Sequence, residues 1–329
     1  MTKKGMEKGR YLYLYLITAV ICFVIVVIVA VVLVYGNPFS GEESTGIIVS
    51  ESSIAQAVSN DVSIQEESKV PDDGTVDVSG YIEISVQHSE LFEGNLILVT
   101  NKTDATAPIK DSLDLMMIYG NKQGSKYSLS TAELLLNTEA LNAFNLMMHG
   151  FGVSTAETHV MVNNAYASID GLTKDKMFES YADLASGRSV RLAVYPSEFG
   201  KMGEGVYLWF SEHCHEYGYI LRYPADKTEK TGAEASATMF RYVGKPHSEY
   251  IKQNNLSLEE YIELIKEYDY KKPLIYTGLG GEKYYIYYQR AVTDSSTAIN
   301  VPGDRAYSVS GNNTDGFIVT VSADKLPEQ

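Results

Sequence analysis

Cysteine is scarce in this chain, whose 329 residues contain only Cys22 and Cys214. Cys22 lies within a long apolar run near the amino terminus, and Cys214 lies far beyond that run. If the run crosses a membrane, the two thiols cannot meet and an intrachain disulfide is excluded. The rest of the chain must then be held by an ordinary hydrophobic core, which about 250 residues can supply.

Basic residues are also few, since 27 lysines and arginines stand against 42 aspartates and glutamates, for a formal charge of −15. The first ten residues hold four of the basic side chains and one acidic one, so the remainder carries about −18. Proteins that bind nucleic acid present lysine and arginine patches to the phosphates. The charge balance therefore argues against nucleic acid as a partner.

Residues 11–35 contain no charged side chain and are rich in Val, Ile and Leu. As a helix they would reach ~37 Å, enough to cross a hydrocarbon core of roughly 30 Å. A cleaved signal peptide is the alternative, but its apolar core is shorter and ends at a small-residue cleavage site. We therefore predict a single uncleaved anchor in the plasma membrane. The basic residues among 1–10 indicate a cytoplasmic amino terminus and an extracellular remainder.

Residues 36–80 are rich in Ser, Asp and Glu and almost lack aromatic side chains, which predicts a disordered acidic linker. From Tyr81 the composition becomes mixed apolar and aromatic, and we expect one domain over residues 81–329. Its strands and helices are interspersed without regular βαβ alternation, which favours an α+β fold. A β-rich extension is expected from about residue 270.

Hydrophobic spacing predicts the individual elements of this domain. The helix that begins at Ser257 has a capping-box pattern, and the helix before Gly218 ends at a glycine. The expected helices are 131–148, 174–185, 205–217 and 257–268, and the expected strands are 96–99, 159–163, 284–289 and 318–321.

The segment Glu216–Gly244 resembles the zinc D-alanyl-D-alanine carboxypeptidases of the VanY type, a peptidase M15 family. In that family a G-F-I-L-R-Y-P-like strand precedes E-x-W-H-F-R-Y-V-G. Both flanks are present here, as Gly218–Pro224 and Phe240–Gly244, but Met239 stands in place of the metal-binding His. The resemblance implies a VanY-like fold at the cell wall of a Gram-positive bacterium.

The resemblance also implies a second zinc motif, S-x-H-x-x-G-x-A-x-D, which we place on Ser186–Tyr195. In this register Arg188 replaces the His ligand and Tyr195 the Asp ligand. Met239 replaces the third ligand, and Ser236 replaces the glutamate that acts as general base. Three protein ligands and a carboxylate are what a catalytic zinc site needs. We therefore expect no metal and no catalytic residue at these positions.

The family's substrate-binding segment, S-G-Y-R-S, corresponds to residues 164–168, with an alanine in place of the arginine. The candidate residues for a ligand cleft are Tyr166, Ser168, Ser186, Arg188, Arg191 and Arg241. A guanidinium suits a peptide carboxylate, so Arg188 and Arg191 could bind a ligand in the former metal pocket. The alternative, which we favour, is a structural ion pair with Glu234 or Glu204.

His213, Cys214 and His215 together imitate a metal site. Residues two apart on a helix point to different faces, however, so the two histidines cannot easily share one ion. A packed or surface helix is the preferred interpretation.

The sequence thus predicts a membrane-anchored VanY-like protein that has lost zinc and peptidase activity. Its expected role is binding or regulation at the wall, with a peptidoglycan peptide or a wall-associated protein as partner. Two alternatives remain, an active D,D-carboxypeptidase with unrecognised ligands and a structural partner of another membrane protein.

Overall fold

The computed structural model describes residues 74–100, 113–168, 182–293 and 295–325, which all belong to the unit Glu67–Gln329. The predicted anchor, most of the acidic linker and residues 174–181 of one predicted helix lie outside them. Among the residues that are described, no helix has the length and hydropathy needed to cross a membrane.

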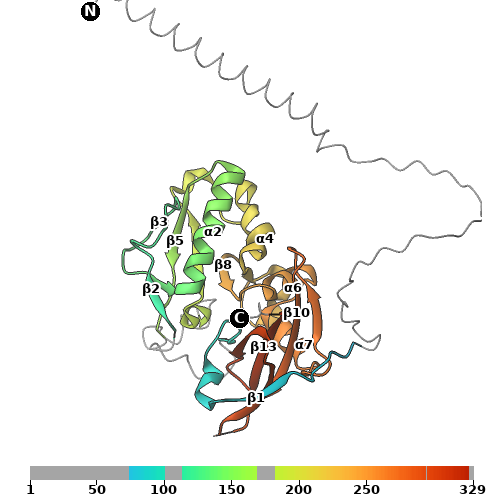
Figure 1. Ribbon diagram of the computed structural model, residues 1–329. Coiled ribbons are helices and arrows are strands. Elements are labelled where there is room, and N and C mark those ends of the chain that lie inside the picture. The colour runs from blue at the N-terminus through green and yellow to red at the C-terminus, as the bar shows by residue number, and fades with distance from the viewer. Residues whose placement is uncertain (1–73, 101–112, 169–181, 294, 326–329) are drawn as a thin grey trace, which may run out of the picture. The chain divides into compact units, whose positions relative to one another are not determined.

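A five-stranded sheet forms the first half of the fold, with strand order β3-β5-β6-β8-β7 (Figure 1). Its strands are β3 (Ser128–Leu129), β5 (Val160–Asn164), β6 (Ser189–Val194), β8 (Ser236–Tyr242) and β7 (Tyr219–Tyr223). Only β3 and β5 are parallel. On β6 and β8, Arg191 lies opposite Met239 and Ser189 lies opposite Arg241. Because alternate residues point to opposite faces, these four side chains share one face of the sheet.

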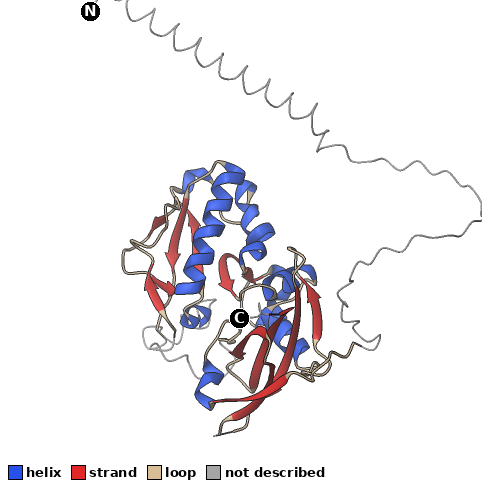
Figure 2. Ribbon diagram, in the orientation of Figure 1, coloured by secondary structure: helices blue, strands red, loops and turns tan. Residues whose placement is uncertain are grey.

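The other face of the sheet is covered by α2 (Thr138–Thr155), whose apolar side chains pack on β5 and β6 (Figure 2). Asn137 caps this helix by accepting a hydrogen bond from the Ala140 amide at 3.1 Å. The prediction of one helix over 131–148 is wrong at its start. Residues Leu135–Asn137 form β4, which pairs with β2 (Leu115–Met117), so the cap sits at the end of a strand.

The helical segment predicted over 205–217 is present as three consecutive short helices, η7 (Gly205–Leu208), α4 (Trp209–His213) and η8 (Cys214–Tyr217). It ends at Gly218, whose φ of 81° lies in the left-handed region. Glycine adopts this region without a steric penalty, so the predicted end is confirmed.

Two helices follow β8, α6 (His247–Gln253) and α7 (Leu258–Ile265). The capping box at the start of α7 is confirmed, because Ser257 Oγ accepts from the Glu260 amide at 3.2 Å and Glu260 Oε2 accepts from the Ser257 amide at 2.9 Å. The shorter helices elsewhere are η1 (His88–Phe92), η5 (Ala182–Ser186), η6 (Ser197–Phe199), η9 (Ala225–Lys227) and α5 (Thr228–Thr231).

The carboxyl-terminal part contains a four-stranded antiparallel sheet of order β12-β13-β10-β9. Its strands are β9 (Leu274–Thr277), β10 (Lys283–Arg290), β12 (Arg305–Gly311) and β13 (Gly316–Lys325). Beside it, β11 (Thr297–Pro302) pairs with β1 (Tyr81–Val86), the first described strand of the domain (Figure 1). Side chains from all these parts share one core, including Val86, Tyr287 and Val319. The β-rich extension is therefore completed by residues from the start of the domain, which the sequence did not indicate.

The segment Leu96–Val99 is buried as predicted, but it is not a strand. The carbonyls of Asn95 and Ile97 accept hydrogen bonds from Arg241 Nη2, at 3.1 and 2.8 Å. A guanidinium thus satisfies backbone groups that a neighbouring strand would otherwise satisfy.

Gly311 on β12 packs directly against the backbone of η1. A Cβ at this position would lie 2.1 Å from the Leu91 carbonyl oxygen, a backbone atom that cannot rotate away. Overpacking of this kind costs about 1–3 kcal/mol, so we expect Gly311→Ala to lower the free energy of unfolding by that amount. Gly80→Ala is the matched control, because no atom lies within 4 Å of its added Cβ. Urea denaturation followed by fluorescence measures both, and equal midpoints would contradict the packing argument.

Candidate functional site

Arg222 and Arg241, which belong to the two segments that resemble the carboxypeptidase family, both bind the buried carboxylate of Asp183. Arg222 Nε of β7 donates to Asp183 Oδ1 at 3.1 Å, and Arg241 Nη1 of β8 donates to the same oxygen at 2.8 Å. Ser189 Oγ donates to the other carboxylate oxygen. Arg222 also forms a two-bond contact with Glu259 of α7, at 3.1 and 2.7 Å.

This buried network ties η5, two strands and α7 together. Burial alone would raise the pKa of Asp183, but the positive charges of Arg241 and Arg222 outweigh it and hold the pKa below its ordinary value. The carboxylate is therefore ionised at neutral pH, and the buried charges compensate one another. Arg241, predicted to line a ligand cleft, is fully buried and bonded to Asp183 and to backbone carbonyls. That prediction is wrong, because the side chain braces the interior.

The three residues predicted at the metal positions do not lie together. Tyr195 follows the end of β6 and is 57% exposed, whereas Met239 is 1% exposed. Arg188 precedes β6, and its Nε donates to Asn95 Oδ1 at 2.8 Å. A set of metal ligands must converge on one point, so the register that we assigned to the first zinc motif is wrong.

A different register brings the motif positions together. Its glycine fits Gly187, which has a φ of 68° and where a Cβ would lie 2.8 Å from Leu115. The His position then falls on Leu184 and the Asp position on Arg191. Leu184 and Met239 belong to one small buried apolar cluster, and Arg191 lies opposite Met239 in the ladder. Leu184, Arg191 and Met239 are thus the residues that the fold gathers on this face.

These residues do not fit a zinc ion. Leu184 has no donor atom, Arg191 brings a positive charge and Met239 offers only a weakly accepting thioether. Ser236, at the general-base position, shares a hydrogen bond of 3.0 Å with the Thr238 hydroxyl. Across the described ranges, no group of three or more His, Cys, Asp or Glu side chains could hold a metal ion.

The remaining cleft candidates divide between the interior and the sheet edge. Ser186 is fully buried, and its hydroxyl donates to the Asp183 carbonyl at 2.6 Å and accepts from the Arg188 amide at 3.1 Å. It therefore shapes a turn and does not line a cleft. Tyr166 is half-buried and Ser168 exposed, just past β5. Ala167 between them packs against the cluster of Leu184 and Met239, so this segment borders the same face.

The structure gives Arg188 partners other than those we favoured. Its hydrogen bonds go to Asn95 and to the Ser186 carbonyl, at 3.2 Å in the second case, and neither Glu204 nor Glu234 is among them. Arg191 Nε donates weakly to Thr238 Oγ1 at 3.4 Å.

The His213–His215 segment is helical, as preferred. His213 Nδ1 contacts Glu216 Oε1 at 2.7 Å, while Cys214 is buried in the apolar core. Burial raises the pKa of the Cys214 thiol to about 12. A protonated thiol in the core is a poor metal ligand, so Cys214 serves the packing of this helix.

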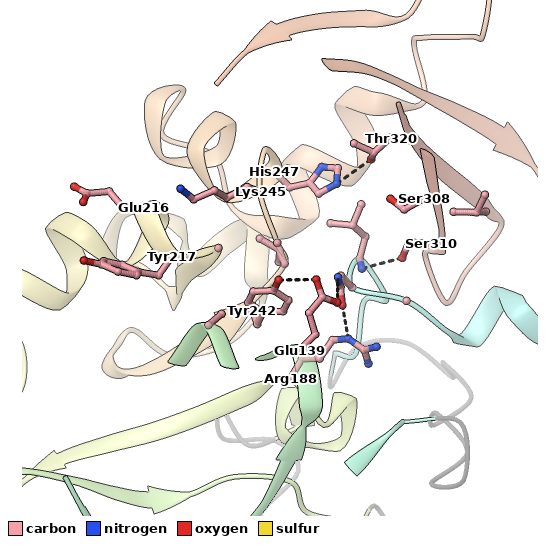
Figure 3. A pocket seen from close by; sticks show the side chains of 18 of the residues that line it. Glu139, Arg188, Glu216, Tyr217, Tyr242, Lys245, His247, Ser308, Ser310 and Thr320 are labelled. Atoms are coloured by element: carbon pink, nitrogen blue, oxygen red, sulfur yellow. Dashed lines mark hydrogen bonds between the residues drawn. The ribbon is translucent and has the colours of Figure 1, made fainter. Parts of the chain in front are cut away.

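A cavity lies elsewhere in the described part of the chain. It has a volume of about 640 Å³ and opens between α2, the ends of β7 and β8, and strands β12 and β13. Figure 3 shows Glu139 and Arg188 on one side of it and Ser308, Ser310 and Thr320 on the other. None of Leu184, Arg191 and Met239 lines this cavity. It was missed from sequence because its walls come from segments far apart in the chain.

The helices and sheets described above make up a mixed helix-and-sheet domain. No protein-family model matches the chain. It is 32% identical over 247 residues to a D-alanyl-D-alanine carboxypeptidase of Enterococcus faecium, covering 73% of this chain and 78% of the relative. A bifunctional D-Ala-D-Ala dipeptidase and carboxypeptidase, VanXYC of Enterococcus gallinarum, is 45% identical over 58 residues, 18% of this chain and 30% of its own length.

Among solved structures, the D,D-dipeptidase VanXYg, in complex with a D-Ala-D-Ala phosphinate analogue, superimposes with a TM-score of 0.62. The superposition covers 74% of this chain and 99% of the VanXYg chain, at 24% sequence identity. At this identity it shows a common fold. The chain therefore belongs to the VanY/VanX-type D-alanyl-D-alanine carboxypeptidase family. The resemblance noted in the sequence, and the mixed fold it implied, are confirmed.

Proposed function

We propose that this chain is a non-hydrolytic member of its family that binds peptidoglycan peptide. One observation carries the proposal. The positions that the zinc motif assigns to metal ligands hold Leu184, Arg191 and Met239, gathered on one face of the sheet. A guanidinium among apolar side chains repels a dication and cannot activate water.

The same face is suited to holding a peptide end. Arg191 lies beside the hydroxyls of Thr238 and Ser236, and Met239, which lies opposite Arg191 on β8, is 1% exposed and belongs to the interior. A guanidinium binds a carboxylate through charge-assisted hydrogen bonds, and hydroxyls can accept or donate to a peptide group. The guanidinium of Arg191 can thus bind the terminal carboxylate of the peptide. It cannot activate water, so hydrolysis is lost while binding is kept.

The location that we propose follows from the sequence. Residues 11–35 would anchor the chain in the plasma membrane, and the acidic residues after them would let the domain search the wall zone beyond it. The linker ends before the predicted residue 80, because the Val76 amide donates to the Lys271 carbonyl at 3.1 Å and the Val76 side chain packs on the carboxyl-terminal core. A peptidoglycan peptide is the partner proposed for the domain, and a wall-associated protein is the competing occupant of the same face.

The test uses the full-length chain in detergent. Zinc content is measured by atomic absorption, and the chain is offered a pentapeptide that ends in D-Ala-D-Ala. We expect no chelator-sensitive release of D-Ala, together with measurable binding by calorimetry. A hydrogen bond to a charged group contributes about 1.5–3 kcal/mol, so Arg191→Met is expected to weaken binding at least ~10-fold.

Arg290→Met is the matched control, because the Arg290 side chain is 77% exposed on β10. Release of D-Ala that a chelator stops would refute the loss of activity. Equal weakening in the two variants would refute the role of Arg191.

A further inference from the structure

The cavity of about 640 Å³ is lined by a cation that lacks an anionic partner. Arg188 is 7% exposed, and its side-chain hydrogen bonds go to the Asn95 side-chain oxygen and the Ser186 carbonyl. Within the described residues, no carboxylate lies within ion-pair distance of it, although Glu139 is near enough to raise its pKa. Burial, with the nearby charge of Arg241, nevertheless lowers the pKa of Arg188 to about 10. A buried charge without a partner is costly.

A carboxylate is held beside this cation without pairing with it. Glu139 Oε1 accepts from the Tyr242 hydroxyl at 2.7 Å, and Glu139 Oε2 accepts from Asn95 Nδ2 at 3.0 Å. The other end of the same Asn95 amide accepts from Arg188. The Asn95 amide thus joins the two charged side chains, which Figure 3 shows at the cavity wall.

Both charged groups keep hydrogen-bonding capacity. A guanidinium has five N–H donors, and two of those of Arg188 have protein acceptors. An ionised carboxylate has about four acceptor sites, and two of those of Glu139 have protein donors. Asn95 therefore displays a cation and an anion side by side, each able to bind one more group.

The other ionisable groups of the cavity do not change this balance. Glu216 and Lys245 add one charge of each sign. Burial lowers the pKa of His247 to about 3, so it is neutral, and its ring is bonded to Tyr261 and Thr320. A ligand with a single charge would be repelled by either Arg188 or Glu139, which carry opposite charges. A ligand with one positive and one negative group can pair with both side chains.

We propose that this cavity binds a small zwitterion with a free ammonium and a free carboxylate, either an amino acid or a short peptide. The carboxylate binds Arg188, and the ammonium binds Glu139. The volume is within the roughly 300–1,000 Å³ typical of small-molecule sites. The site is separate from the face that carries Arg191, so neither proposal depends on the other.

The experiment titrates the full-length chain with glycylglycine, N-acetylglycylglycine and glycylglycinamide by calorimetry. Glycylglycine is expected to bind at least ~10-fold more tightly than either blocked form, because each blocked form loses one charge-assisted contact. Glycine itself distinguishes a free amino acid from a peptide as the source of the zwitterion. Equal affinities for the three dipeptides, or no binding of any of them, would overturn the proposal.

Variants locate the site. Glu139→Gln keeps the size of the side chain and one of its two acceptor oxygens but removes the charge, and Arg188→Gln removes the cation. Each is expected to weaken glycylglycine binding ~10-fold. Ser308→Trp covers the other wall from an exposed position on β12 and leaves both charged residues in place. It should also block binding, even if Arg188→Gln does not fold. Arg290→Met should bind as the unchanged chain does. Binding that survives both Ser308→Trp and Glu139→Gln would refute the site.

Discussion

Replacing Asp183 by asparagine is expected to lower the free energy of unfolding by about 3–5 kcal/mol, as for removal of one partner from a buried ion pair. The carboxylate is fully buried and accepts hydrogen bonds from Arg222, Arg241 and Ser189. Arg222 would keep Glu259, but Arg241 would lose its carboxylate while remaining buried. Urea denaturation at pH 7 measures the difference.

The same residue predicts how stability depends on pH. Its pKa in the folded chain lies below the ordinary 3.8, so the stabilisation is fully present above that value and is lost as the pH falls through the folded pKa. The difference in the free energy of unfolding between the unchanged chain and Asp183→Asn should therefore become smaller below about pH 4. Urea unfolding midpoints of both chains at pH 7 and at pH 3 test this expectation.

Asp226→Asn is the control for this prediction. Asp226 lies on η9, where its carboxylate accepts from Asn255 Nδ2 at 2.9 Å at an exposed position. An amide can keep that contact, so the unfolding midpoint should stay close to that of the unchanged chain. If both variants unfold at the same urea concentration, Asp183 is not the centre of the buried network.

The second large effect is a gain of zinc binding in the combined variant Leu184→His, Arg191→Asp and Met239→His. The three positions meet on one face of the sheet, so two imidazoles and a carboxylate would converge there. Three such ligands with an open fourth position are typical of zinc sites. We expect one zinc per chain by atomic absorption after dialysis, and a rise in melting temperature that a chelator reverses.

The control carries the same three residue types in the other register, as Arg188→His, Tyr195→Asp and Met239→His. Tyr195 is exposed and Arg188 faces another cavity, so these side chains cannot surround one ion. This variant should bind no stoichiometric zinc. Stoichiometric zinc in the control but not in the first variant would show that the register on Gly187 is wrong.

Local patterns in the sequence predicted the elements whose ends are set by neighbouring residues. The Ser257 capping box and the Gly218 helix end are confirmed because each depends on contacts within a few residues. The strands 284–289 and 318–321 lie within β10 and β13. The start of α2 was misplaced because β4 pairs with a strand some twenty residues earlier, a contact that no local period reveals.

At the candidate site, too, local sequence patterns predicted one part and long-range contacts decided the rest. Met239 was identified because the flanking motif residues are nearly unbroken. The first zinc motif is too degraded for its spacing to fix the register, and a serine and an alanine matched in the wrong one. Only the pairing of β6 with β8, with the cluster of Leu184 and Met239, identifies the converging positions.

The sequence by itself determined the family of this protein, the ends of its best-capped helices and the replacement of one zinc ligand by Met239. These depend on the order of residues along the chain and on forces that act within one turn or one strand. The tertiary structure decided which replaced residues share a point, that Arg241 is an internal brace, and that Arg188 and Glu139 face a cavity. Those facts depend on side chains that are distant in sequence and that folding brings within a few ångströms of one another. At that distance the charge and the burial of each side chain depend on its neighbours.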